Sequence, residues 1–173
     1  MSADELARFN GLPAAAAQDE LLACCHSPTW ADRMLSGRPY SSARDAVRQS
    51  SAIVARMSVA DLETALAGHP RIGQRPAVAA GEGKSAQWSR QEQAGVSAAD
   101  GETAAALAES NEEYERRFGH IYLVSAAGRT GPQLLALLRA RLRNSPESEW
   151  QVVRTELQKI NEIRLREMLA GTL

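Results

Sequence analysis

Runs of apolar residues at helical spacing, each opened by a capping residue, organise most of this chain. A serine or threonine stands before several of these runs and a glycine follows several of them, which is the usual pattern of helix starts and ends. The helices predicted in this way cover residues 28–36, 42–57, 59–67, 85–96, 101–117, 131–144 and 147–170. Two prolines and three glycines between residues 69 and 85 predict a loop there.

The segment from Phe118 to Gly128 has a different pattern. It concentrates aromatic and β-branched residues between glycines, so it is either a short strand or an extended buried stretch. Elsewhere alanine and leucine dominate, which favours helix. With 173 residues, 44 % of them hydrophobic, the chain can bury one core. We therefore predict an all-α fold, a single-domain compact bundle of about seven to eight helices over residues 1–173.

Charge and cysteine usage exclude several function classes. The formal net charge is −1, which argues against a nucleic-acid-binding protein, and we interpret Arg139, Arg141 and Arg143 as a solvated helix face. Cys24 and Cys25 are adjacent and offer no disulfide framework. Because no segment has the pattern of a secretory signal or a membrane span, we expect a cytoplasmic protein. The three histidines lack metal-ligand spacing, so no metal site is predicted.

Arg164 interrupts the apolar stripe of the last predicted helix. The hydrophobic members of that stripe are Trp150, Val153, Leu157, Ile160 and Met168. A guanidinium on this face is costly unless it has a partner. Two interpretations stay open. Arg164 is either structural, snorkelling to water or paired with a buried glutamate, or it is an anion clamp whose planar fork matches a carboxylate.

His69 follows the glycine that ends a predicted helix and precedes Pro70, which restricts its backbone. Such a stiff loop presents an imidazole whose pKa lies near neutrality, so His69 is either a general acid/base or a structural loop residue. Ser89, Glu92 and Gln93 share one face of a helix. They form either a capping box, with Ser89 as the N-cap, or a polar face for a heterocyclic ligand.

An ordered set of motifs runs through nearly the whole chain. The set consists of Phe9-Asn10, Ser27-Pro28-Thr29-Trp30, Arg38-Pro39-Tyr40, His69-Pro70-Arg71-Ile72-Gly73, Ser89 with Glu92-Gln93, Asn111, Tyr114, Phe118-Gly119, Arg141-Leu142-Arg143-Asn144 and Ile163-Arg164-Leu165. In these motifs the chain resembles the 2-oxo-4-hydroxy-4-carboxy-5-ureidoimidazoline (OHCU) decarboxylase family. It departs from the usual family pattern at His120, where an apolar aromatic residue is common, and at Ile121, where proline is.

The resemblance implies an all-helical homodimer without cofactor that decarboxylates a small ureidoimidazoline to (S)-allantoin in urate degradation. By the same resemblance, the catalytic residues are His69 as acid/base, Glu92 as its acidic companion and Arg164 as the anion clamp. The substrate contacts implied by the motifs are Pro70, Ser89, Gln93 and the main chain of Tyr122, Leu123, Val124, Ser125 and Ala126. Neither a metal nor a nucleic-acid or membrane partner is expected.

Two other functions remain compatible with the residues alone. The first is a helical interaction module in which His69 and Arg164 are buried structural residues. The second is an enzyme of the same fold that acts on a different ureido substrate. A small polar pocket formed by these side chains distinguishes the enzymes from the module.

Overall fold

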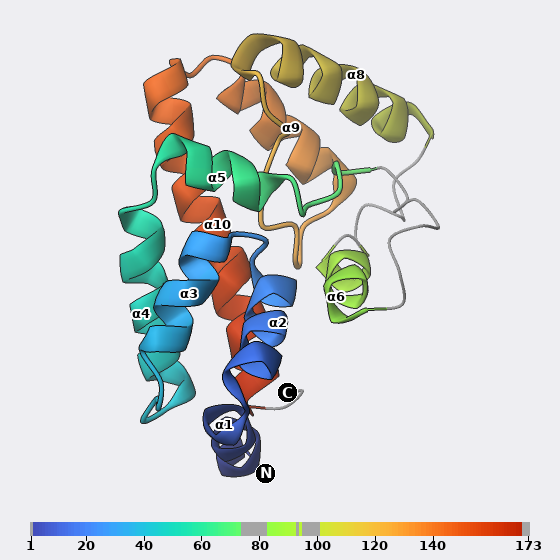
Figure 1. Ribbon diagram of the computed structural model, residues 1–173. Helices are drawn as coiled ribbons and strands as arrows, with labels where there is room; N and C mark the ends of the chain where they lie inside the picture. The colour runs from blue at the N-terminus through green and yellow to red at the C-terminus, as the bar shows by residue number, and fades with distance from the viewer. Residues whose placement is uncertain (1, 74–82, 93, 95–100, 171–173) are drawn as a thin grey trace. The chain divides into compact units, whose positions relative to one another are not determined.

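The computed structural model describes residues 2–73, 83–92, 94 and 101–170, and within them it contains nine α-helices and no strand (Figure 1). The helices are α1 (Ser2–Gly11), α2 (Ala14–Cys24), α3 (Pro28–Ser36), α4 (Ala43–Ala55), α5 (Val59–Leu66), α6 (Lys84–Glu92), α8 (Gly101–Phe118), α9 (Gly131–Arg141) and α10 (Pro146–Ala170). The all-α prediction is confirmed. The predicted number of seven to eight helices is too low for the described residues.

The sequence pattern misses α1 and α2. Pro13 stands at the N-cap of α2 and makes no side-chain hydrogen bond to the first turn. Residues 14–17 are all alanine, so that turn has no contrast between polar and apolar positions. Without a capping side chain or an amphipathic stripe, nothing local marks this start, and the helix depends on burial of residues such as Leu21.

Most of the predicted helix starts are confirmed. The N-cap side chains that accept a hydrogen bond from the first turn are Ser27, Ser42, Ser58 and Thr130. At α5 the box is reciprocal, because Ser58 Oγ accepts from the Asp61 N–H at 3.1 Å while the Asp61 carboxylate accepts from the Ser58 N–H at 3.2 Å. Each such cap contributes about 1 kcal/mol, which explains why short helices begin where the sequence indicates.

The chain divides into two compact units. The first consists of Met1–Gly68 and Leu157–Leu173, and the second consists of His69–Glu156. Helix α10 therefore contributes its first turns to the second unit and the rest to the first.

In the first unit, α3 packs against α2 and α4. Trp30 is fully buried and donates its indole N–H to Ser50 Oγ at 3.1 Å. Asn10 exchanges two hydrogen bonds of 2.9 Å with the main chain of Tyr40. Arg38 donates to the carbonyl of Phe9 at 2.7 Å. These contacts join the motifs near residues 9 and 38.

In the second unit, α8 packs against α9 around one hydrophobic cluster. The cluster consists of Ile72, Leu107, Tyr114, Tyr122, Val124, Ala126, Leu134 and Leu138. Residues 121–126 are neither helix nor strand, and Figure 1 shows them as a drawn-out trace between α8 and α9. Of the two interpretations of this segment, the extended buried stretch is therefore correct.

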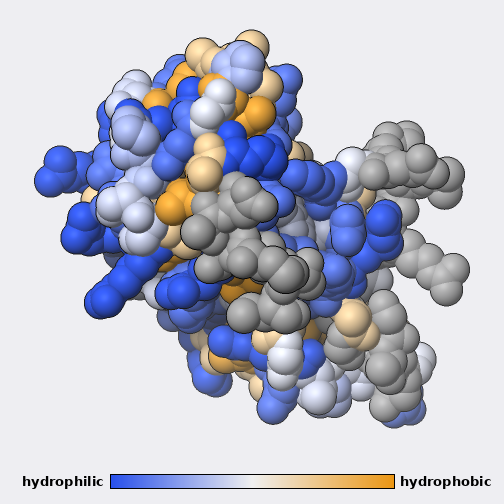
Figure 2. Space-filling model, turned by 90° about the horizontal axis from the view of Figure 1, so that it is seen from below, coloured by the Kyte–Doolittle hydropathy of each residue, from blue (hydrophilic) through white to orange (hydrophobic). Residues whose placement is uncertain are grey.

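None of the described helices is long and apolar enough to cross a membrane. Figure 2 views the molecule from below, relative to Figure 1. Hydrophilic side chains cover most of the described surface on this face, and hydrophobic ones lie in small groups. The exposed large hydrophobic side chains among the described residues are Val59, Leu137 and Ile163.

Candidate functional site

The loop that carries His69 begins at a close backbone approach. An added Cβ on Gly68 would lie 2.3 Å from His26 Cβ and 2.7 Å from His26 Cγ, so only glycine fits there without movement. His69 follows directly and is half-buried, with its Nε2 atom shielded from solvent. A shielded imidazole after a tightly packed glycine and before Pro70 has little freedom to move, which suits a group that must transfer a proton in one direction.

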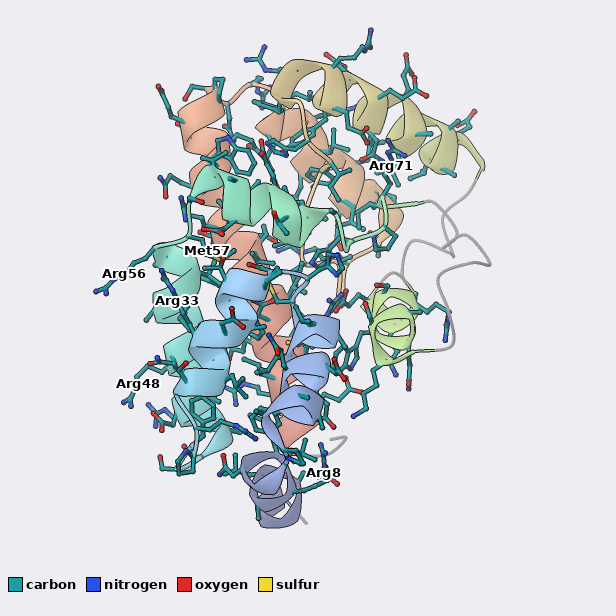
Figure 3. All side chains as sticks on the ribbon, in the orientation of Figure 1. Arg8, Arg33, Arg48, Arg56, Met57 and Arg71 are labelled. Carbon is teal, nitrogen blue, oxygen red and sulfur yellow. The ribbon has the colours of Figure 1, made fainter. Side chains whose placement is uncertain are left out.

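The residues after Pro70 are fastened to α8. The Arg71 guanidinium pairs with the Glu115 carboxylate through two hydrogen bonds, and the Nη2–Oε2 distance is 2.7 Å. Figure 3 shows Arg71 reaching from the loop toward α8. Asn111 donates from Nδ2 to the Ile72 carbonyl at 3.0 Å. Arg71 lowers the pKa of Glu115, chiefly through the hydrogen bond, so the pair is fully charged at neutral pH.

Ser89 and Glu92 lie three residues apart in α6, as predicted. Because α6 begins at Lys84, Ser89 is inside the helix, and the interpretation of Ser89 as an N-cap is wrong. Ser89 is buried, and Glu92 is half-buried at the last position of the helix. Gln93 lies outside the described residues. A buried hydroxyl and a carboxylate one turn apart are compatible with the ligand-facing interpretation.

The main chain of the Tyr122–Ala126 segment is held at two atoms by buried ionic side chains. Arg141 Nη1 donates to the Leu123 carbonyl at 2.6 Å. The Ser125 N–H donates to Glu156 Oε2 at 2.8 Å. All five residues of the segment are buried. The structure therefore gives the predicted substrate-binding main chain a fixed conformation.

Arg141 is part of a buried polar network, so its interpretation as a solvated residue is wrong. Arg141 is 7 % exposed, and its guanidinium donates to Glu149 with an Nε–Oε1 distance of 2.7 Å, while Glu149 is fully buried. Tyr114 donates its hydroxyl to the same carboxylate oxygen, and Asn144 Nδ2 donates to the other at 2.7 Å. The guanidinium also lies 4.7 Å from the centroid of the Tyr122 ring.

Two opposing effects act on the pKa of Arg141. Burial lowers it, but the hydrogen bond to Glu149 and the nearby negative charge raise it above its ordinary value. Burial raises the pKa of Tyr122 to about 12, although the Arg141 charge opposes this change. The Arg141 cation and the neutral Tyr122 phenol thus keep their charge states at physiological pH.

Arg164 is buried in the first unit. It is 2 % exposed, and its Nη1 donates to the Cys24 carbonyl at 3.0 Å. A guanidinium in this position does not reach water, so the snorkelling interpretation is wrong. Burial raises the pKa of the neighbouring Cys25 thiol to about 11, and the hydrogen bond to Asn161 and the Arg164 charge moderate that rise. The anion-clamp and the paired-structural interpretations both remain compatible with this burial.

His120, one of the departures from the family pattern, lies among aromatic side chains. Its ring centroid lies 4.2 Å from that of Trp150 and 5.5 Å from that of Tyr114. A planar imidazole thus packs among the rings of Tyr114, Phe118 and Trp150.

Several polar residues of this site have weak signals in the sequence. Glu149 and Glu156 lie four residues before and three after Val153, on the same stripe as Arg164. Asn111 and Arg141 belong to motifs, but nothing local distinguishes them from surface residues. Among the described residues, no group of three or more histidine, cysteine, aspartate or glutamate side chains is arranged to hold a metal.

The fold and these groups define an all-α protein in which the Arg71–Glu115 pair and Asn111 hold a histidine loop, and buried ionic side chains hold a stretch of main chain. The chain belongs to the OHCU decarboxylase family, whose model matches residues 10–166. It is 29 % identical over 157 residues to the uric acid degradation bifunctional protein TTL of Arabidopsis thaliana. That alignment covers 88 % of this chain and 47 % of the plant protein, so the chain spans about half of that relative.

Two further similarities extend over most of both partners. The chain is 28 % identical over 142 residues to the OHCU decarboxylase of Amia calva, covering 82 % of this chain and 81 % of that protein. It superposes with a TM-score of 0.74 and 27 % identity on the crystal structure of OHCU decarboxylase in the presence of (S)-allantoin, covering 87 % of this chain and 97 % of that one. The resemblance seen in the motifs and the prediction of a carboxy-lyase family are confirmed.

Proposed function

We propose that this chain, acting over residues 1–173 as one catalytic domain, decarboxylates OHCU to (S)-allantoin without a cofactor. The observation that carries the proposal is the family match over residues 10–166, which includes every position assigned to the site. The buried guanidinium, the shielded imidazole and the fixed main chain are the parts that such a reaction needs from the protein.

The substrate itself can accept the electrons that decarboxylation releases. When the carbon–carboxylate bond breaks, carbon dioxide leaves, and its electron pair passes into the ring toward the imine and carbonyl groups. A proton then reaches the ring carbon that carries the ureido group. Delivery of this proton to one face only gives a single enantiomer of allantoin.

Each proposed residue has a role that fits its surroundings. His69 transfers the proton, since its Nε2 is shielded and the following residues are tied to α8. Glu92 sets the charge state of that imidazole. Arg164 binds the anionic part of the substrate, for which a planar guanidinium is suited. Pro70, Ser89, Gln93 and the Tyr122–Ala126 main chain are the proposed substrate contacts.

The test is a coupled assay with a matched variant. OHCU is generated from urate with urate oxidase and hydroxyisourate hydrolase, and its decay is followed by ultraviolet absorbance with and without this protein. We expect accelerated decay with the wild-type protein. A positioned acid/base contributes roughly 10²–10⁴-fold, so His69→Asn should lose most of that acceleration while melting at the wild-type temperature.

Two outcomes contradict this account. If a folded wild-type protein does not accelerate the decay, the proposed reaction is wrong. If H69N retains wild-type turnover, His69 has no part in the chemistry. The homodimer implied by the resemblance and the cytoplasmic location expected from the sequence pattern stay predictions, and sedimentation of the purified chain tests the first.

A further inference from the structure

The backbone N–H and C=O of Val124, in the middle of the Tyr122–Ala126 segment, differ from the backbone groups beside them in their hydrogen bonding. The Leu123 carbonyl and the Ser125 N–H are engaged by Arg141 and Glu156 at 2.6 and 2.8 Å. Val124 lies between them and is 5 % exposed. Its N–H and C=O make no hydrogen bond within the part of the chain that the structure describes. Buried main-chain groups in this state normally have a bonding partner, which here points to a bound ligand.

The two flanking contacts change the hydrogen-bonding strength of Val124. The carbonyl that Arg141 contacts belongs to the same peptide group as the Val124 N–H. Electron withdrawal by the guanidinium therefore makes that N–H a stronger donor. The N–H that Glu156 accepts belongs to the same peptide group as the Val124 carbonyl, so the carboxylate makes that carbonyl a stronger acceptor. The Val124 N–H and C=O, as donor and acceptor, complement the C=O and N–H groups of a ureido or ring amide.

Both ionic side chains, Arg141 and Glu156, are buried. The Arg141 guanidinium is fixed by Glu149, which Asn144 and Tyr114 hold in turn. Glu156 is 6 % exposed and lies seven residues from Glu149 on α10. Buried charges are costly unless paired, and replacing them by apolar residues is often neutral or stabilising. Their presence at both ends of one residue therefore favours a role beyond stability.

We propose that Arg141 and Glu156 are positioning residues, which fix and polarise the main chain of Val124 so that it orients the ureido or amide edge of the substrate. The inference rests on the proposed function, because that function makes this segment a substrate contact. Neither side chain touches the reacting atoms in this account. Both act through the backbone between them.

The test compares two substitutions of Glu156 with a structural control. Glu156→Gln keeps an oxygen that can accept from the Ser125 N–H and loses the charge, whereas Glu156→Met removes the acceptor. Tyr40→Phe removes a buried hydroxyl that donates to the Met34 carbonyl at 2.7 Å in the other unit, so it reports loss of a main-chain hydrogen bond as such. The amide proton shift of Ser125, measured by NMR, reports whether its bond persists.

We expect kcat to fall in the order wild type, E156Q, E156M, with a loss of about tenfold or more in E156M. The excess of (S)-allantoin in the product should fall in the same order, while Y40F keeps both values. Arg141→Lys, which retains the charge but not the planar fork, should also reduce the enantiomeric excess. A folded E156M with wild-type kcat and wild-type enantiomeric excess overturns the proposal.

Binding of (S)- and (R)-allantoin to the same proteins separates this proposal from the proposed function. If the wild-type protein binds (S)-allantoin preferentially but shows no turnover, the proposed reaction is wrong and the binding preference decides the role of Glu156. Loss of that preference in E156M then supports the positioning role, and an unchanged preference overturns it. A wild-type protein that neither turns over OHCU nor binds allantoin overturns both.

Discussion

Replacing Gly68 by alanine perturbs the His69 loop by a single methyl group. The new Cβ would lie 2.3 Å from His26 Cβ and 2.7 Å from His26 Cγ. Carbon atoms in contact lie about 3.5–4.0 Å apart, so one of the two backbones must move by about 1 Å. Gly68 does not have a positive φ, and alanine is therefore compatible with its backbone conformation. The substitution isolates the steric effect.

Overpacking of this kind costs about 1–3 kcal/mol. For a protein of this length, about 2 kcal/mol lowers the melting temperature by roughly 4–8 °C. Because His69 is the next residue, the movement also displaces its imidazole, and kcat should fall more than KM changes. Thermal unfolding and the coupled assay measure the two effects on the same sample.

Two companion variants make this prediction specific. Gly11→Ala is the matched control, since a Cβ there meets nothing within 4 Å, and it should melt at or above the wild-type temperature. His26→Gly removes both atoms that the new methyl group would meet, so it should restore part of the stability of G68A in the double variant. A G68A protein with the melting temperature and kcat of the wild type would refute the reasoning.

Three further predictions concern other charged or buried groups. Arg164→Met should raise KM for OHCU by roughly 10–100-fold, the loss expected for a charge-assisted hydrogen bond, and an unchanged KM would exclude the clamp. Arg71 lowers the pKa of Glu115 in the folded protein. The pair therefore stabilises the folded state fully at pH values above the pKa of Glu115 in the unfolded chain, about 4.3, and this contribution is lost as the pH falls through the lower pKa of the folded state. Glu115→Gln should therefore show a smaller loss of stability between pH 7 and pH 3 in urea titrations. Cys25, buried with a pKa of about 11, should react with a thiol reagent at pH 8 only after unfolding.

The sequence predicted the helices that carry a local signal. The starts of α3, α4, α5 and α9 follow from a side chain that bonds the first turn, and such a bond depends only on residues three positions apart. Helix α2 has no such signal, because its cap is Pro13, so the sequence pattern does not predict it. Local chemistry thus determines where a helix begins, whereas burial alone determines whether an unmarked one forms.

The same limit applies to the candidate site. Arg164 stands out in the sequence because a charge interrupts a regular apolar stripe. The interpretation of Arg141 as solvated is wrong because its partners Leu123, Tyr114 and Glu149 come from other parts of the chain, and only the fold brings them together. Arginines on solvated and buried helix faces have the same spacing, so the pattern alone could not distinguish them.

The enantiomeric composition of the allantoin formed in the coupled assay tests the central claim most directly. Spontaneous decay of OHCU gives a racemate, and circular dichroism of the product distinguishes this from a single enantiomer. The account predicts that the wild-type protein both accelerates the decay and yields optically active (S)-allantoin. Decay at the spontaneous rate to racemic allantoin, from a sample that melts cooperatively, would contradict it.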